Sequence, residues 1–240
     1  MEPGMKEDAK NHFDTIADGY HEEISGHVRD HLINKWWGIV SSHFMSNTRV
    51  LDIGCGEGTN VNFMSRKNLN VQGVDFSDGL VQQAHARYPQ LVSQISQGDA
   101  LHLQFEDASF DVATLIGVLH HIYSREDQIL AIQEALRVVR KGGVVIIRES
   151  NLINPVFRLF WNYIFPLTAK IDRFGGEHWI SASYLRKHFP QQIEDTVYFT
   201  FIPNFMPLSL MGIAENIERK LEAGPLHKLS AHYTMILRKA

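Results

Sequence analysis

Short apolar runs separated by amphipathic segments dominate the middle of the chain. Short runs at 48–54, 70–76 and 110–119 predict strands, and the unbroken apolar run FDVATLIGVL at 110–119 is typical of a central parallel strand covered on both faces. A shorter strand followed by a loop is expected within 91–100, and VVIIRES at 144–150 predicts a fifth strand.

Helices are expected between these strands. One begins after Gly58, and another is capped by Ser77 and runs through about Arg87. In REDQILAIQEALRVVRKGG the apolar residues recur at helical spacing, with acids early, bases late and Gly142 just past the expected end. Strands that alternate with helices through right-handed crossovers predict an α/β fold with a doubly wound, mostly parallel sheet and helices on both faces.

The alternation stops after residue 150. The next strand pattern is VYFTFIP at 197–203, and AHYTMILRK at 231–239 predicts a final strand. Nothing divides the chain into separately folding units, so we expect one domain. Its parts are an N-terminal lid (1–48), a ligand-binding core (49–150), an inserted lid (151–193) and C-terminal strands (194–240).

The composition fits this reading, with 44% hydrophobic and 21% charged residues in a chain of 240. A net charge of -4 gives no general reason to bind nucleic acid. Cys55 is the only cysteine, which excludes an internal disulfide and a multi-cysteine metal site, and we predict no metal. The polar start MEPGMKEDAK has no apolar signal core, so a cytoplasmic location is expected.

The most apolar segment, LINPVFRLFWNYIFPL at 152–167, is bounded by prolines and carries Arg158. It is shorter than the roughly 20 residues needed to span a bilayer. We therefore expect no transmembrane helix. An interfacial segment that touches a membrane stays open as an alternative, although its basic content is thin.

Candidate chemistry follows the strands, because ligands of open parallel sheets bind outside the carboxyl ends of the strands. LDIGCGEGTN places Gly54, Gly56 and Gly58 after the first strand, where the absence of Cβ permits unusual dihedrals and close approach of a ligand. Asp75 ends the next strand, from where a carboxylate can accept hydrogen bonds from both ribose hydroxyls. Together they predict a nucleoside site. The sixth position of the turn is Thr59, which disfavours a dinucleotide, and the lack of a Gly-Lys-Ser/Thr ending disfavours a triphosphate.

Four ordered motifs make this reading more specific: VLDIGCGEG, GVDFS, QGDALHLQFEDASFDVA and EALRVVRKGGVVII. They resemble those of class I S-adenosylmethionine-dependent methyltransferases, in the small-molecule branch that includes quinone-biosynthesis and natural-product enzymes. NHFDTIADGYHE resembles that branch's Phe-Asp-x-x-Ala-x-x-Tyr segment. The resemblance covers about residues 44–150 continuously and implies a seven-stranded Rossmann-like sheet, with S-adenosylmethionine as methyl donor and S-adenosylhomocysteine as product.

The resemblance also implies which residues contact the cofactor. Those expected near the methionine part and ribose are Gly54, Gly56, Gly58, Asp52 (at the ammonium group), Asp75 (at the ribose hydroxyls) and Tyr20 (closing over the methionine end). Those expected near the adenine or the reacting methyl are Phe76, Asp99, Ala100, Ile116 and Gly117. Two structural alternatives stay open, a tight glycine turn without a ligand and a turn-stabilising role for Asp52.

His120 and His121 follow the fourth strand, where the family often has a Leu-His-His sequence. One of them is expected to be structural and the other a general base, since histidine titrates near neutral pH; family analogy favours His121. Glu149 is either a substrate ligand or a solvated charge at the strand end. Further substrate candidates from the insertion are Trp161, Tyr163, His178 and Tyr184, although Trp161 and Tyr163 also fit an aromatic helix packed on the sheet edge.

We therefore expect methyl transfer by in-line displacement to a small, hydrophobic or amphiphilic acceptor. Positioning is the chain's main contribution to such a reaction, because the sulfonium is already reactive. The alternative function is a non-catalytic S-adenosylmethionine-binding sensor or assembly module. The expected partner is a small molecule rather than nucleic acid.

Overall fold

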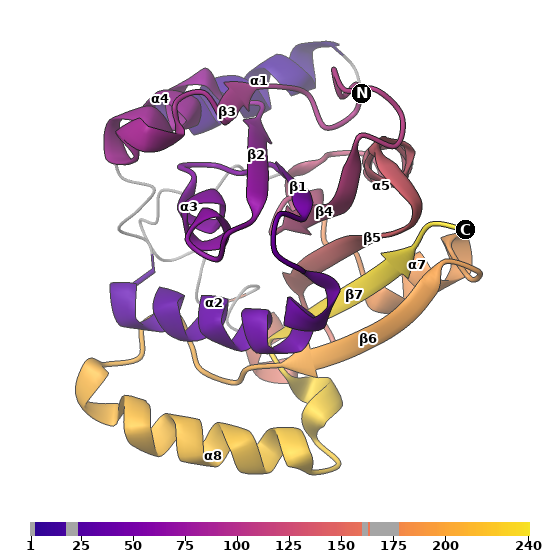
Figure 1. Ribbon diagram of the computed structural model, residues 1–240. Coiled ribbons are helices and arrows are strands. Elements are labelled where there is room, and N and C mark those ends of the chain that lie inside the picture. Colours follow the sequence, from indigo (N-terminus) through magenta and orange to yellow (C-terminus); the bar gives the residue numbers. More distant parts are fainter. Residues whose placement is uncertain (1–2, 18–23, 160–162, 164–177) are drawn as a thin grey trace.

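One open sheet, covered on both faces by helices, forms the centre of the molecule (Figure 1). The computed structural model describes residues 3–17, 24–159, 163 and 178–240. The strands are β1 (Arg49–Ile53), β2 (Asn70–Asp75), β3 (Ile95–Gln97), β4 (Phe110–Ile116), β5 (Val139–Ser150), β6 (Ile193–Phe199) and β7 (His232–Arg238). The helices are α1 (Pro3–Ile16), α2 (Gly26–Val40), α3 (Thr59–Ser65), α4 (Asp78–Arg87), α5 (Arg125–Val138), α6 (Pro155–Leu159), α7 (Ala182–His188) and α8 (Met211–Ala223).

The strands of this part of the chain form a seven-stranded sheet in the order β3-β2-β1-β4-β5-β7-β6. β1 to β5 run parallel, and β7 is antiparallel to both β5 and β6. The chain leaves β1 toward β3 and then crosses back to β4, so the topology switches between β1 and β4. This confirms the predicted fold class, and the carboxyl ends of β1 and β4 mark the place where a ligand binds in such a sheet.

The hydrophobic core lies in two layers. On one face of the sheet, α5 and α7 contribute buried residues such as Ile132 and Leu185. On the other face, α2, α3 and α4 contribute Trp36, Met64 and Ala84. Helices therefore cover both faces of the sheet, which is why the central strand β4 could be predicted from a continuous rather than an alternating apolar run.

One boundary and one whole element differ from the sequence prediction. α5 ends at Val138, because Val139 adopts an extended conformation and pairs with Phe110 of β4. Gly142 is therefore not the residue that ends the helix; it lies within β5 with a positive φ of 75°. The helix α8, which the sequence analysis did not predict, occupies much of the C-terminal region expected to hold only strands.

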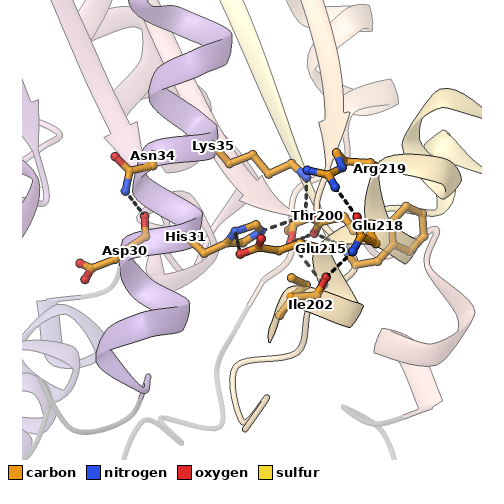
Figure 2. Close-up of polar contacts among 12 residues, drawn as sticks. Asp30, His31, Asn34, Lys35, Thr200, Ile202, Glu215, Glu218 and Arg219 are labelled. Carbon is orange, nitrogen blue, oxygen red and sulfur yellow. Dashed lines mark hydrogen bonds and ion pairs between the residues drawn. The ribbon is translucent and has the colours of Figure 1, made fainter. Parts of the chain in front are cut away.

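The carboxylate of Glu218 on α8, which is 1% exposed, binds side chains of α2 (Figure 2). His31 Nε2 lies 2.9 Å and Lys35 Nζ 2.5 Å from Glu218 Oε2, while Oε1 accepts hydrogen bonds from Thr200 Oγ1 (2.6 Å) and from the Phe201 amide (2.8 Å). A single acid thus joins α2, α8 and the loop after β6.

The described residues contain no helix that is long and apolar enough to cross a membrane. Most of the second half of the apolar segment 152–167 lies outside the described ranges.

Candidate functional site

The loop after β1 needs glycine for reasons of its own. Gly54, Gly56 and Gly58 all have positive φ, of 71°, 53° and 79°. A Cβ on Gly54 would lie 2.4 Å from Val118 Cγ2, and one on Gly58 would lie 2.7 Å from Ile95 Cδ1. Backbone conformation and close packing therefore both demand glycine at these two positions, and contact with a cofactor stays a prediction.

Asp75 holds the glycine turn in place. Its Oδ2 accepts a hydrogen bond from the Gly56 amide (2.7 Å) and its Oδ1 accepts one from the Ser77 amide (2.9 Å), while burial raises the pKa of the carboxyl group. Each carboxylate oxygen has further acceptor capacity, so ribose hydroxyls can still donate to Asp75. The residue is placed as the prediction requires, at the end of the strand next to the turn.

Asp52 has one oxygen without a partner. The residue is 1% exposed; its Oδ1 accepts a hydrogen bond from Thr114 Oγ1 (2.6 Å), whereas its Oδ2 is buried and makes no hydrogen bond. Burial raises the pKa of Asp52 to about 7. The bond to Thr114 joins two strands rather than stabilising the turn, and the unpaired oxygen fits an ammonium group, so the site suits the amino-acid end of the expected donor.

The residues expected at the adenine follow β2 and β3, which are neighbours in the sheet. Asp99 receives hydrogen bonds from the Leu101 amide (3.0 Å) and contacts His102 Nδ1 at 3.2 Å. Phe76 and Ala100 are half-buried, and Ala100 packs against the core. The fold thus brings Phe76, Asp99 and Ala100 close to Asp75, and their roles toward adenine stay predictions.

Helix α1 contacts both the loop after β2 and the loop after β4. Asp14 accepts hydrogen bonds from Ser77 Oγ (2.6 Å) and from the Gly79 amide (2.9 Å) at the start of α4. Phe13 contacts the ring of His121 edge-on, with ring centroids 4.9 Å apart. The segment that contains Phe13 and Asp14 therefore reaches from the loop after β2 to the loop after β4, and its role as a lid stays a prediction.

A buried carboxylate orients His120. Glu149 is 2% exposed, so its interpretation as a solvated charge is wrong. Its Oε1 accepts hydrogen bonds from the amides of Val118 (3.0 Å) and Leu119 (2.8 Å), and its Oε2 lies 2.6 Å from His120 Nδ1. The ring of His120 stacks on the ring of Trp179, with ring centroids 4.4 Å apart. Both oxygens of Glu149 are thus engaged by the loop after β4 rather than free for a substrate.

His121 has a different environment. Its ring is 3.9 Å from that of His120, and its Nδ1 is buried without a hydrogen bond. Burial, with smaller contributions from His120 and His12, holds the pKa of His121 well below its usual value. His121 is therefore uncharged and a weak base, and the contacts favour His120 over the residue preferred on sequence grounds.

β4 ends close to both histidines. Ile116 is buried and Gly117 has a φ of 70°. A Cβ on Gly117 would meet only His120 Cε1, at 3.9 Å, so the glycine leaves open space beside the histidine ring. Ile116 and Gly117 are therefore at the switch point, where the reacting methyl is expected.

His178, in the described part of the insertion, is hydrogen-bonded to the loop after β4. The His178 amide donates to the His120 carbonyl (2.8 Å), and the His178 carbonyl accepts from Gln128 Nε2 (2.5 Å). Because Gln128 also donates to the carbonyls of Leu119 and Ile122, one buried amide holds both chain segments together. The sequence analysis did not identify Gln128 or Trp179 as part of the site, since their roles depend on contacts between distant segments.

Of the remaining predicted substrate residues, the structure describes Tyr163 and Tyr184. Tyr163 is 68% exposed, and Tyr184 is half-buried with the Arg125 guanidinium 5.0 Å from its ring centroid. Tyr20 and Trp161 lie outside the described residues. Cys55 is buried, and burial raises the pKa of its thiol. Within the described ranges, no group of three or more histidine, cysteine or acidic side chains is arranged to hold a metal ion.

The strand order and the helices on both faces of the sheet define a Rossmann-like fold of the methyltransferase type. Solved structures with this fold include a SAM-dependent methyltransferase from Methanosarcina mazei, with a TM-score of 0.60 and 20% identity over 84% of this chain and 96% of that one. The [4+2]-cyclase SpnF is also similar, with a TM-score of 0.57 and 21% identity over 85% of this chain and 80% of that one. At these identities the likeness establishes the fold alone.

The sequence comparisons identify the family of the core. The family model described as "Methyltransferase domain" matches residues 51–147. A "Probable S-adenosylmethionine-dependent methyltransferase" of Mycolicibacterium smegmatis is 33% identical over 47% of this chain and 42% of its own length. A demethylmenaquinone methyltransferase of Staphylococcus aureus is 29% identical over 52% of this chain and 54% of its own. The chain thus spans about half the length of these relatives, and its residues 51–147 match a methyltransferase domain.

Proposed function

We propose that the chain transfers a methyl group from S-adenosylmethionine to a small, hydrophobic or amphiphilic molecule. The observation that carries this proposal is the pair of acids at the switch point of the sheet. Asp75 is hydrogen-bonded across the glycine turn with acceptor capacity to spare, and Asp52 presents a buried oxygen without a partner. A nucleoside joined to an amino acid offers the hydroxyl and ammonium donors that these two carboxylates lack.

The donor supplies an electrophilic methyl group on a sulfonium. The residues of the chain then have to position the acceptor, exclude water and take up any proton that the acceptor loses. His120 is our candidate for the last task, because its Nδ1 lies 2.6 Å from the buried carboxylate of Glu149, which orients the ring. Glu149 acts in this proposal as a positioning residue rather than as the substrate ligand expected from the sequence.

The surroundings of His120 support an acceptor with an apolar body. The ring of Trp179 covers one face of His120, and Phe13 contacts the adjacent His121. The name of the demethylmenaquinone methyltransferase relative supports a small-molecule acceptor in the same way, although that name applies to the relative. We therefore keep a hydrophobic or amphiphilic small molecule as the proposed acceptor class.

Calorimetric titration with S-adenosylmethionine tests the donor site. Asp75→Ala should weaken binding by about 10-fold or more, because hydrogen bonds to a charged group are each worth roughly 1.5–3 kcal/mol. Asp78→Ala is the matched control, since Asp78 is a nearby acid on α4 that only bonds Gln82. Equal affinity of the two variants would contradict the assignment of Asp75.

A labelled-methyl assay against the small-molecule fraction of a cell extract tests turnover. Transfer of label to a low-molecular-weight product supports the enzyme, and donor binding with no transfer to any fraction supports the sensor alternative. This assay is needed because the similar fold of a [4+2]-cyclase shows that the architecture alone does not decide the reaction.

A further inference from the structure

Arg148 of β5 is a second charged side chain on the face of the sheet where Asp52 lies; the residue is half-buried and its Nη1 atom is buried. It pairs with Ile116 on β4 and with Thr234 on β7, while Asp52 pairs with Thr114, two residues before Ile116. Directly paired residues point to the same face, and so do residues two apart along a strand. Asp52 and Arg148 therefore share the face covered by α2, and Arg148 lies two residues nearer the carboxyl edge.

The guanidinium of Arg148 has no partner. Within the part of the chain that the structure describes, it makes no hydrogen bond or ion pair, and its Nη1 is buried. Burial lowers the pKa of Arg148 to about 10, against the opposing effect of the Glu149 and Asp52 carboxylates, so the group is still charged at neutral pH. A buried donor atom of a charged group without an acceptor is rare in native proteins, so the buried Nη1 of Arg148 points to a ligand that completes it.

Asp52 and Arg148 act on each other electrostatically but do not touch. Each lowers the energy of the other's charged form, yet no ion pair or hydrogen bond joins them. The nearby His232 has a pKa of about 3 because of burial and therefore adds no charge at neutral pH. Glu149 lies on the opposite face and is engaged by the loop after β4. The face thus presents one unpaired acceptor and one unpaired cation.

We propose that Arg148 binds the carboxylate of the methyl donor's α-amino acid group, beside Asp52, which is expected at the ammonium group of the same donor. The proposal rests on the proposed function and extends it to a residue outside the motifs. An amino-acid zwitterion has no net charge, like the pair of side chains, so binding satisfies both unpaired groups without burying an uncompensated charge. A guanidinium also matches a carboxylate in shape. Arg148 then selects donors with an intact amino acid.

Ligand truncation isolates this contact. S-adenosylhomocysteine and 5′-methylthioadenosine are each titrated calorimetrically into the wild-type chain and into Arg148→Met. The variant should lose about 10- to 100-fold in affinity for S-adenosylhomocysteine, the equivalent of a charged hydrogen bond, and should bind 5′-methylthioadenosine as the wild type does. Arg148→Lys keeps the positive charge but not the planar guanidinium, so its affinity for S-adenosylhomocysteine should lie between those of the wild type and Arg148→Met.

Two controls keep the outcomes distinct. Arg186→Met removes an exposed arginine of α7 and should change neither affinity. The melting temperature of ligand-free Arg148→Met should equal or exceed that of the wild type, because the substitution removes a buried donor atom that has no partner. If wild-type chain binds neither ligand, the proposed function fails. If it binds S-adenosylhomocysteine but Arg148→Met has no effect, or weakens both ligands equally, the assignment of Arg148 is overturned.

Discussion

Replacing Glu218 with glutamine perturbs the buried carboxylate that joins α2 to α8 (Figure 2). The four groups that surround this side chain are all donors: His31, Lys35, Thr200 and the amide of Phe201. Glutamine keeps the size of the side chain but replaces one acceptor oxygen with a donor NH₂ group. At least one of the four donors must then lose its partner. Lys35 keeps an ion pair with Glu222 alone.

The pKa of Glu218 sets the size of the effect. Burial opposes ionisation, but the hydrogen bonds from the surrounding donors outweigh it and lower the pKa from 4.5 to about 2. One pKa unit corresponds to about 1.36 kcal/mol, so the full shift is equivalent to about 3 kcal/mol at neutral pH. Solvent near Lys35 screens part of this, and we expect a loss of about 2 kcal/mol in the free energy of unfolding. Because the folded-state pKa is the lower one, this stability is present above pH 4.5 and is lost as the pH falls toward 2.

Urea denaturation of wild type, Glu218→Gln and Glu215→Gln at several pH values measures this effect. Glu215 serves as the control because it lies on the same helix, is 41% exposed at its side chain and contacts only His31, at 3.4 Å. The difference between wild type and Glu218→Gln should be about 2 kcal/mol at neutral pH and should shrink by about half at pH 3. A loss no larger than that of Glu215→Gln, or a difference independent of pH, would refute the reasoning.

The other predictions concern the turn and the loop after β4. Gly54→Ala should cost at least about 2 kcal/mol in urea denaturation, since alanine is strained at positive φ and its Cβ would lie 2.4 Å from Val118; a neutral substitution would mean that the turn can relax. Gln128→Leu should cost about 2 kcal/mol by the same measurement, because three carbonyls lose their shared donor, and an unchanged midpoint would contradict this. Glu149→Gln should lower methyl transfer by roughly 10- to 100-fold and change its pH profile with donor affinity intact, because His120 loses its carboxylate partner; an unaltered profile would exclude the positioning role.

The sequence predicted residues 48–150 well because the relevant signals there are local. Apolar runs identified the first four strands, and Ser77 caps α4 as expected, with its Oγ accepting from the Leu80 amide at 3.1 Å. The end of α5 was wrong because the pairing of Val139 with β4 overrides a helical pattern. α8 was missed, and hydrophobic periodicity misleads there: the helix buries Glu218 and leaves Ile213 and Ile217 exposed.

By itself, the sequence determined the glycine turn and the acid that follows it, since spacing along consecutive strands places Gly54 and Asp75 at one sheet edge whatever the rest of the chain does. The tertiary structure decided which of two adjacent histidines has a carboxylate partner, because Glu149 reaches His120 from another strand. It also decided that Asp52 and Arg148 share a face, which depends on the register of three strands. Local patterns encode elements and their ends, whereas contacts between distant segments depend on how the sheet brings those elements together.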